Sequence, residues 1–268
     1  MNNDPTFIYP HDRLLKEYKL ISKKHIKIFD FYLDSLKKFD KLFDKLHHRF
    51  AKLINDTGHS LNGRYVFIMM QMKETIDSHY THYFALKKGA CNGTYPALRH
   101  SYESLLKNYY FLIQPMDKKN FINLTGEGLS KTRKTLYSEK MLKRQNKIYD
   151  MLCVKTHAGV RGSAVAYMPM KDSYKDCLEL GVILLSSHYV LLLDSFGRFV
   201  TPKELEKIIK FIEKFQKIIG SLPNFMPDNP KIVDMLKISY KHPLKQSGNR
   251  KDFFRSKEHY FKSCFIKQ

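Results

Sequence analysis

The stretch TYPALRHSYESLLKNYYFLIQ, residues 94–114, decides the fold, because it predicts a helix with one wide apolar face and a charged edge. At about 100° per residue, one stripe collects these apolar side chains: Leu98, Tyr102, Leu105, Leu106, Tyr109, Leu112 and Ile113. Pro96 suits the first turn of a helix, where its missing N–H costs nothing, and Pro115 predicts the end of the helix. Arg99 and Glu103 lie one turn apart on the edge of the stripe.

The charge pair on this edge has two interpretations. It is a structural ion pair that bridges two helices, or it belongs to a site where the core meets a groove. His100, Ser104 and Lys107 are expected to point away from the core.

The composition favours helices joined by short loops. The chain has 268 residues, of which 43% are hydrophobic, with only 12 glycines and 10 prolines. We expect one all-α domain of six to eight helices, built as a long N-terminal antiparallel hairpin packed on a helical bundle. The expected divisions are an arm over residues 1–10, a helical domain over 11–240 (hairpin 11–88, bundle 90–240) and a basic, aromatic tail over 241–268.

The formal net charge of +21 points to an anionic partner. Nucleic acid is the first candidate and an anionic membrane surface the second, because such a charge repels itself in a compact fold. The alternative is that a lysine-rich composition only keeps the protein soluble.

The cysteine pattern favours a reducing compartment. Four cysteines occur without a C-x-x-C pair, and no early apolar segment resembles a signal peptide, so a cytoplasmic location is expected. The most apolar stretch, residues 178–199, contains Glu179, His188 and Asp194. These side chains favour a buried central helix over a membrane span.

Two seams of apolar residues predict the N-terminal hairpin. In the first helix, expected over residues 12–54, one residue in every three or four is apolar: Phe29, Tyr32, Leu36, Phe39, Phe43, Leu46, Phe50 and Leu53. The second helix, expected over residues 62–88, has a matching seam that includes His79. The first helix is longer, so its remainder must pack elsewhere in the chain or against a second subunit.

Further helices are expected along the rest of the chain. Residues 131–156 predict one helix capped by Ser130, basic in its first half and apolar in its second. A buried helix is expected to run from Asp172 or Ser173 to about Phe199, and Thr201-Pro202-Lys203-Glu204 predicts the start of the next through a capping box.

Nucleotide-binding and hydrolase motifs such as G-x-x-x-x-G-K-[ST], G-x-G-x-x-G, H-E-x-x-H and G-x-S-x-G do not occur in the sequence. His79 and His82 have a spacing that can hold a metal on a helix, but packed or surface histidines are the preferred interpretation. No metal or cofactor is expected.

Basic residues interleaved with aromatic ones predict nucleic-acid contacts, because aromatic rings stack on bases while cations neutralise phosphates. The candidates are Lys131, Arg133, Lys134, Lys140, Lys143, Arg144, Lys147, Arg250, Lys251 and Arg255. For the tail, docking of its phenylalanines on the core is the alternative.

Arg99, Glu103, His157 and Arg161 form a candidate catalytic set, provided that the fold brings them together. An arginine can clamp a phosphate, and a histidine can move the proton of an RNA 2′-hydroxyl or protonate the leaving oxygen. A carboxylate can orient that histidine. The alternative is a salt bridge beside an unrelated loop histidine.

Ala97-Leu98-Arg99 with Glu103 on one helix, followed after a basic helix by Tyr149, Cys153 and His157, resembles a family of bacterial all-helical proteins. That family has an Arg-x-x-x-Glu helix and a later Tyr-x-x-Leu-Ser-x-x-x-His segment, with Cys153 standing here in the position of the Ser. Its helices are similar to those of HEPN proteins, frequently metal-independent ribonucleases of toxin–antitoxin, abortive-infection and CRISPR systems. The usual HEPN signature, Arg-x(4–6)-His, does not occur here.

The resemblance covers roughly residues 90–160 and implies catalytic roles for Arg99 and His157, with Glu103 as the orienting residue. The expected function is therefore nucleic-acid binding, with RNA preferred, and metal-independent RNA cleavage in phage defence or a toxin–antitoxin system. The alternative is a non-catalytic helical scaffold that works by homodimerisation or by binding a partner protein.

Overall fold

The structure, a computed structural model, describes residues 10–57, 60–61, 63–88, 91–113, 128–156, 170–196, 199–219, 225, 227–230 and 265–266. Helices make up nearly all of this part, which confirms the all-α class. Their bounds are α1 Pro10–Thr57, α2 Gly63–Lys87, α3 Cys91–Ile113, α5 Leu129–Leu136, α6 Glu139–Thr156, α8 Met170–Phe196 and α9 Pro202–Ile219. A two-residue antiparallel pair joins β1 Ser60–Leu61 to β2 Phe265–Ile266.

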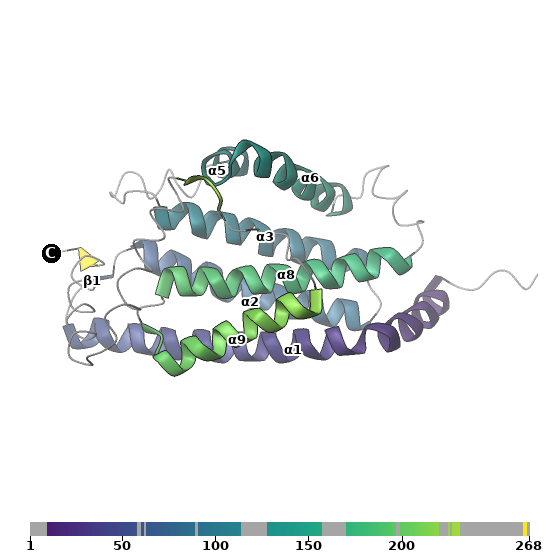
Figure 1. Ribbon diagram of the computed structural model, residues 1–268, viewed down its shortest axis with the longest axis horizontal. Helices are drawn as coiled ribbons and strands as arrows, with labels where there is room; N and C mark the ends of the chain where they lie inside the picture. The colour runs from purple at the N-terminus through teal and green to yellow at the C-terminus, as the bar shows by residue number, and fades with distance from the viewer. Residues whose placement is uncertain are drawn as a thin grey trace, which may run out of the picture.

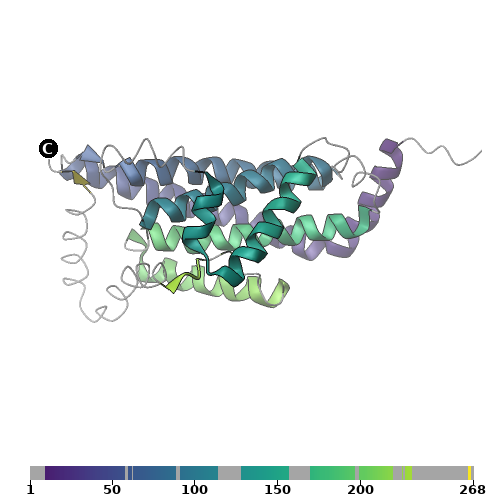
Figure 2. The same ribbon diagram turned by 90° about the horizontal axis from the view of Figure 1, so that it is seen from above.

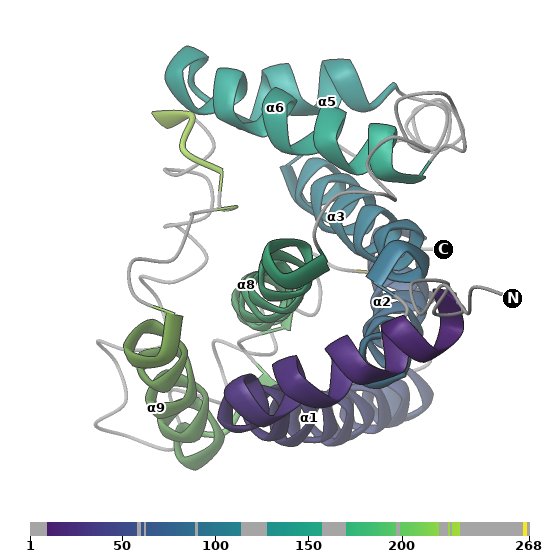
Figure 3. The same ribbon diagram turned by 90° about the vertical axis from the view of Figure 1, so that its right-hand side faces the viewer.

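Helix α8 is the centre of the bundle (Figures 1 and 3) and packs against α1, α2, α3 and α9. Helices α5 and α6 pack on α3. They lie across the long helices obliquely (Figure 2), on the side of the bundle opposite α1 and α9 (Figure 3). The molecule therefore presents two separate faces, one formed by α5 and α6 and the other by α1 and α9.

The predicted seams form the core between α1, α2 and α8. In α1 the buried seam consists of Phe29, Tyr32, Leu36, Phe39, Phe43, Leu46 and Phe50. In α2 it consists of Met69, Met72, Ile76, His79, Tyr83 and Leu86. Helix α1 packs on α2, α8 and α9, and the first buried residue among its described side chains is Phe29, whereas Leu20 and Ile26 nearer its start are exposed. Packing of this first part against a second subunit stays a prediction.

Helix α3 is buried on more than its predicted stripe. The stripe is buried as expected, but the prediction that Ser104 points away from the core was wrong, because its hydroxyl accepts a hydrogen bond from Thr75 of α2 at 2.8 Å. The helix also begins at Cys91, so Pro96 lies inside it. Thr94 and Tyr95, which precede the proline, are buried, so the packed face continues to the N-terminal side of Pro96. This packing compensates for the one backbone hydrogen bond that Pro96 cannot donate.

The predicted helix over residues 131–156 is two helices, and the prediction of Ser130 as its cap was wrong. Gly128 is the N-cap of α5, and Tyr137 has an extended backbone that ends the helix. The buried hydroxyl of Tyr137 donates to the carbonyl oxygen of Phe225 at 2.7 Å. Ser138 then caps α6, held by hydrogen bonds to the carboxylate of Asp228. Contacts some ninety residues away in the sequence thus place the break.

Residues 175–196 of α8 are long and apolar enough to cross a membrane by length and composition alone, and 78% of the most apolar window is buried in the bundle. One of its buried polar side chains, Asp194, accepts a hydrogen bond from Tyr109 of α3 at 3.0 Å. The structure thus places the predicted central helix inside the protein.

Replacing Gly181 of α8 by alanine is expected to destabilise the protein by about 1–3 kcal/mol, because the added methyl group would overpack the core at this position. A Cβ atom at this position would overlap Cε1 of His82 and lie 3.2 Å from the hydroxyl of Tyr32. Urea denaturation measures the loss. Gly128→Ala is the matched control, since its Cβ would meet nothing within 4 Å and it costs only a weaker N-cap, about 0.5 kcal/mol. Equal midpoints for both variants would contradict the tight packing.

Candidate nucleic-acid interface

Arg99 and Glu103 form the ion pair that their spacing predicts, on the side of α3 that faces α6. Nε of Arg99 donates to Oε1 of Glu103 at 2.8 Å. Both side chains are about one-fifth to one-quarter exposed, so the pair lies at the rim of the core. The hydrogen bond that Arg99 donates to Glu103 raises the pKa of Arg99 above its ordinary value, and the arginine stays charged.

Tyr149 of α6 contacts both members of this pair. Its hydroxyl donates to Oε1 of Glu103 at 3.1 Å and lies 3.3 Å from Nη2 of Arg99, whose guanidinium is 5.6 Å from the ring centroid. Burial, the Cys153 thiol and the charge of Glu103 together raise the pKa of Tyr149 to about 12. At neutral pH the cluster is therefore a cation, a carboxylate and a neutral phenol, locked by hydrogen bonds between α3 and α6.

Arg133 of α5 approaches the same tyrosine. Its guanidinium carbon lies 4.2 Å from the ring centroid of Tyr149, and Nε donates to Oδ1 of Asn146 at 3.0 Å. Arg133 was predicted to contact nucleic acid directly, but it is buried and Nη1 has no hydrogen-bond partner among the described residues. Its charge instead reinforces the positive potential beneath the α5–α6 face.

The other predicted cations of α5 and α6 are exposed to solvent: Lys131, Lys134, Lys140, Lys143, Arg144 and Lys147. Lys143 meets Glu139 at 3.4 Å, but both side chains are more than three-quarters exposed, so this pair contributes little. Helices α5 and α6 together carry eight Lys or Arg residues against Glu139 and Asp150. We call the six exposed residues of this set, from Lys131 to Lys147, the α5–α6 basic face.

Five of the predicted site residues lie outside the described residues: His157, Arg161, Arg250, Lys251 and Arg255. His157 is the residue directly after Thr156, the last residue of α6. The structure thus brings Arg99, Glu103 and the basic helices together, while the expected roles of His157 and Arg161 stay predictions.

The paired histidines of α2 lie in the core. The hydroxyl of Tyr32 is 2.7 Å from Nδ1 of His79 and 3.1 Å from Nδ1 of His82, and Ser101 lies 3.0 Å from Nε2 of His79. His188 of α8 stacks edge-on against His79, with ring centroids 5.4 Å apart. Among the described residues, no group of three His, Cys, Asp or Glu side chains is arranged to hold a metal ion.

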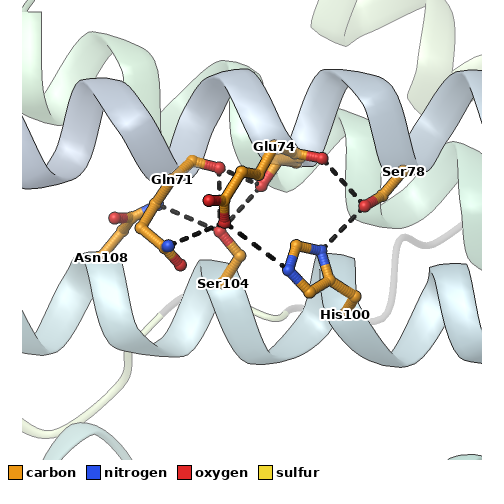
Figure 4. A network of polar contacts seen from close by, with 7 residues as sticks. Gln71, Glu74, Ser78, His100, Ser104 and Asn108 are labelled. Atoms are coloured by element: carbon orange, nitrogen blue, oxygen red, sulfur yellow. Dashed lines mark hydrogen bonds and ion pairs between the residues drawn. The ribbon is translucent and has the colours of Figure 1, made fainter. Parts of the chain in front are cut away.

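A second polar network joins α2 to α3 on the surface (Figure 4). The Ser78 hydroxyl donates to the carbonyl oxygen of Glu74 and lies 2.8 Å from Nδ1 of His100, and Nε2 of His100 lies 3.7 Å from the Glu74 carboxylate. These residue types match a hydrolase triad, but the hydroxyl is already engaged with its own helix and the imidazole is half exposed. The network fastens α2 to α3.

A groove between α1 and α9, with Tyr189 of α8 at its base, was not predicted. It has a volume of about 570 Å³, and lysines form both of its walls. The available signal was the spacing i, i+3, i+7, which the lysines follow on each wall, at 38, 41 and 45 and at 207, 210 and 214. The two segments are far apart in the sequence, so only the fold shows that they face one groove.

The arrangement at α3, α5 and α6 places exposed cations and an ordered arginine on neighbouring helices, which is the chemistry that an anion-binding surface needs. No protein-family model matches the chain, and neither a curated protein nor a solved structure matches it.

Proposed function

We propose that the protein binds nucleic acid, with RNA preferred, across the α5–α6 basic face and the adjoining edge of α3. The observation that carries this proposal is the convergence of the basic helices on the Arg99 cluster: Arg133 and Arg99 both contact Tyr149. Exposed lysines lie on the same two helices, so a phosphate backbone would meet charge at the surface beside an ordered arginine.

The chemistry of the face suits a backbone contact more than a base-specific one. Its exposed cations are lysines and one arginine on long flexible stems, which neutralise phosphates without fixing sequence. Binding of this kind releases counterions, and the logarithm of the affinity for a single strand falls by about 0.7 per phosphate contact for each logarithmic unit of salt.

Charge reversal on α6 tests the proposal. Lys143→Glu combined with Arg144→Glu is expected to weaken binding of fluorescein-labelled oligouridylate by about tenfold or more. The dependence of the affinity on salt should also fall, by the amount that corresponds to about one to two phosphate contacts. Fluorescence anisotropy at several salt concentrations measures both quantities. The matched control is Lys27→Glu combined with Lys37→Glu, which makes the same charge change on exposed residues of α1.

Two outcomes would contradict this proposal. One is affinity that is absent or does not depend on salt. The other is an equal loss in the α1 control, because the whole charge of the protein would then act rather than the α5–α6 face. If RNA binding is absent, the scaffold function becomes the preferred one. It is favoured by an apolar groove of about 380 Å³ between α1 and α2 and by the exposed side chains of Met70 and Phe84.

Metal-independent cleavage of the bound RNA is the finer form of the proposal, in keeping with the resemblance to ribonucleases of phage defence and toxin–antitoxin systems. Its support is the place of Arg99: the guanidinium is charged, held by Glu103 and Tyr149, and lies at the edge of the basic face. In this proposal His157 accepts the proton of the 2′-hydroxyl, and the 2′-oxygen attacks the phosphorus while Arg99 stabilises the charge on the phosphate. The bond to the 5′-oxygen breaks, and that oxygen leaves with a proton from water.

A further inference from the structure

The groove between α1 and α9 carries a dense positive charge that is mostly uncompensated. Its walls hold six lysines, all exposed: Lys38, Lys41 and Lys45 on α1, and Lys207, Lys210 and Lys214 on α9. Lys38 pairs with Asp34 and Lys210 with Glu206, each along its own helix at 2.6–2.7 Å. Among the described residues the other four form no ion pair, so lysine faces lysine across the groove and along each wall.

One carboxylate, that of Glu204, lines the groove, and its charge is paired with an arginine. Glu204 receives two hydrogen bonds from the guanidinium of Arg49, at 2.7 and 2.9 Å, and also closes the capping box with Thr201. Despite partial burial, these hydrogen bonds lower the pKa of Glu204 to about 2. An anion that enters the groove therefore meets lysines and no free carboxylate from its lining.

The floor of the groove is apolar. Leu42, Tyr189, Ile208 and Phe211 form it, and the hydroxyl of Tyr189 is directed away to the carbonyl oxygen of Ser35 at 2.8 Å. The amines of Lys38 and Lys214 lie 5.8 Å from the ring of Phe211 and 5.1 Å from that of Phe31, so their stems run along the same apolar surface. A ligand can meet this floor only through apolar groups.

We propose that this groove binds an acidic amphipathic helix of a partner protein, with the apolar stripe of that helix on the floor and its carboxylates against both lysine walls. The lysines of each wall span seven residues, a rise of about 10 Å, which is two turns of helix. Asp and Glu residues on either side of an apolar stripe recur at this spacing. This site is independent of the α5–α6 basic face.

A single-stranded nucleic acid is the competing occupant, and the floor disfavours it. Base binding in such grooves relies on open aromatic faces. Here Phe211 stacks on Phe31 with ring centroids 5.3 Å apart, and Tyr189 packs against Phe39 and Phe211, so both rings are covered. The lysines alone would hold a phosphate backbone, while the floor would stay without a partner.

Fluorescence anisotropy with a labelled peptide tests the proposal. The probe is a helix of Leu, Ala and Glu of about 15 residues, with leucines on one stripe and glutamates on both flanks. The control peptide has the same composition with the stripe scrambled. We expect the striped peptide to bind the full chain about tenfold tighter than the scrambled one. Lys41→Glu combined with Lys207→Glu is expected to remove that advantage.

Matched variants keep the outcome decisive. Lys143→Glu combined with Arg144→Glu on α6 is expected to leave peptide affinity unchanged, and Lys41→Gln with Lys207→Gln replaces the reversal if the glutamate variant does not fold. Equal affinity for both peptides, or no binding of either, overturns the proposal. An equal loss of oligouridylate and peptide binding in the groove variant also overturns it, because the groove would then be a nucleic-acid site.

Discussion

Acidification from pH 7 to pH 5 is expected to lower the free energy of unfolding by about 4 kcal/mol through His82 and His188, and further through His79, because all three are buried as neutral rings in the core. His79, His82 and His188 are each no more than 1% exposed. A loss of this size is comparable with the whole stability of many domains, about 5–15 kcal/mol. We therefore expect a protein that is stable at neutral pH and unfolds in weak acid.

The geometry around these rings explains why they resist protons. Burial lowers the pKa of His82 to about 3 and that of His188 to about 4. Burial also lowers the pKa of His79 well below its ordinary value, and the neighbouring His188 and His82 lower it further. Nε2 of His82 and of His188 has no hydrogen-bond partner among the described residues, so a proton placed there would be a buried, unpaired charge.

The sign of the effect follows from which state binds more protons. An unfolded histidine takes up a proton near pH 6.5, whereas folded His82 does so only near pH 3 and folded His188 only near pH 4. The pKa of folded His79 is lowered in the same direction. Stability is therefore complete above pH 6.5 and falls as the pH drops through the window between these values. His82 and His188 each contribute about 1.4 kcal/mol per pH unit in this window, or about 2 kcal/mol between pH 7 and pH 5, and His79 adds to the loss in the same direction.

Urea denaturation at pH 7.5, 6.5 and 5.5 measures this slope. His188→Leu is expected to reduce the slope by about one proton, because it removes one neutral ring whose Nδ1 bonds only a helical carbonyl oxygen, that of Leu184. His48→Ala, at an exposed position of α1, is the control for a histidine replaced outside the core. A denaturation midpoint that is the same at pH 7.5 and pH 5.5 would refute the prediction.

Carboxylates do not account for a loss in this pH range. Glu204 has a pKa near 2, so its contribution to stability is present above about pH 4.5 and is lost only as the pH falls from there towards 2. Unfolding that starts near pH 6 thus reports the histidines, and unfolding that starts below pH 4.5 reports carboxylates such as Glu204.

The sequence predicted those parts of the fold that depend on local periodicity. The seams of α1 and α2 were identified because a buried face repeats every three to four residues. The capping box at Thr201 and Glu204, and the Arg99–Glu103 pair, were identified because both partners lie within one turn. Each of these features needs no information from a distant segment.

The features that the sequence did not predict depend on contacts between distant segments. The break at Tyr137 depends on Phe225 and Asp228. Arg133 looks like its exposed basic neighbours, and only the packing of α5 on α3 and α6 turns it inward. The lysine groove requires two segments that are joined by the whole bundle. Such placements become visible only when the helices are assembled.

Arg99→Ala and His157→Ala are each expected to reduce metal-independent RNA cleavage by about 100-fold or more, while RNA affinity changes by less than about threefold. The reason is that Arg99 would stabilise charge on the phosphate only in the transition state, whereas the lysines of the α5–α6 basic face supply the ground-state binding. The assay is cleavage of oligouridylate in EDTA, with a 2′,3′-cyclic phosphate as the expected product.

His100→Ala is the matched control for this assay. His100 follows Arg99 directly, but it faces α2 and contacts Ser78 and Glu74 rather than the basic helices (Figure 4). Removing it leaves the Arg99 cluster intact, so cleavage should be unchanged. A loss in His100→Ala equal to that in Arg99→Ala would mean that damage to α3, rather than loss of the guanidinium, lowers the rate.

Arg99→Lys separates chemistry from stability. Alanine leaves Glu103 half-buried without its cation, which destabilises the α3–α6 contact, whereas lysine keeps the charge beside Glu103. Lysine lacks the planar fork of the guanidinium, so it cannot hold Glu103, the hydroxyl of Tyr149 and a phosphate in the same geometry. We expect Arg99→Lys to fold like the parent chain and still to lose most of its cleavage rate. If cleavage persists unchanged in Arg99→Lys, Arg99→Ala and His157→Ala, then Arg99 and Glu103 are a structural ion pair, and the α5–α6 basic face binds RNA without cutting it.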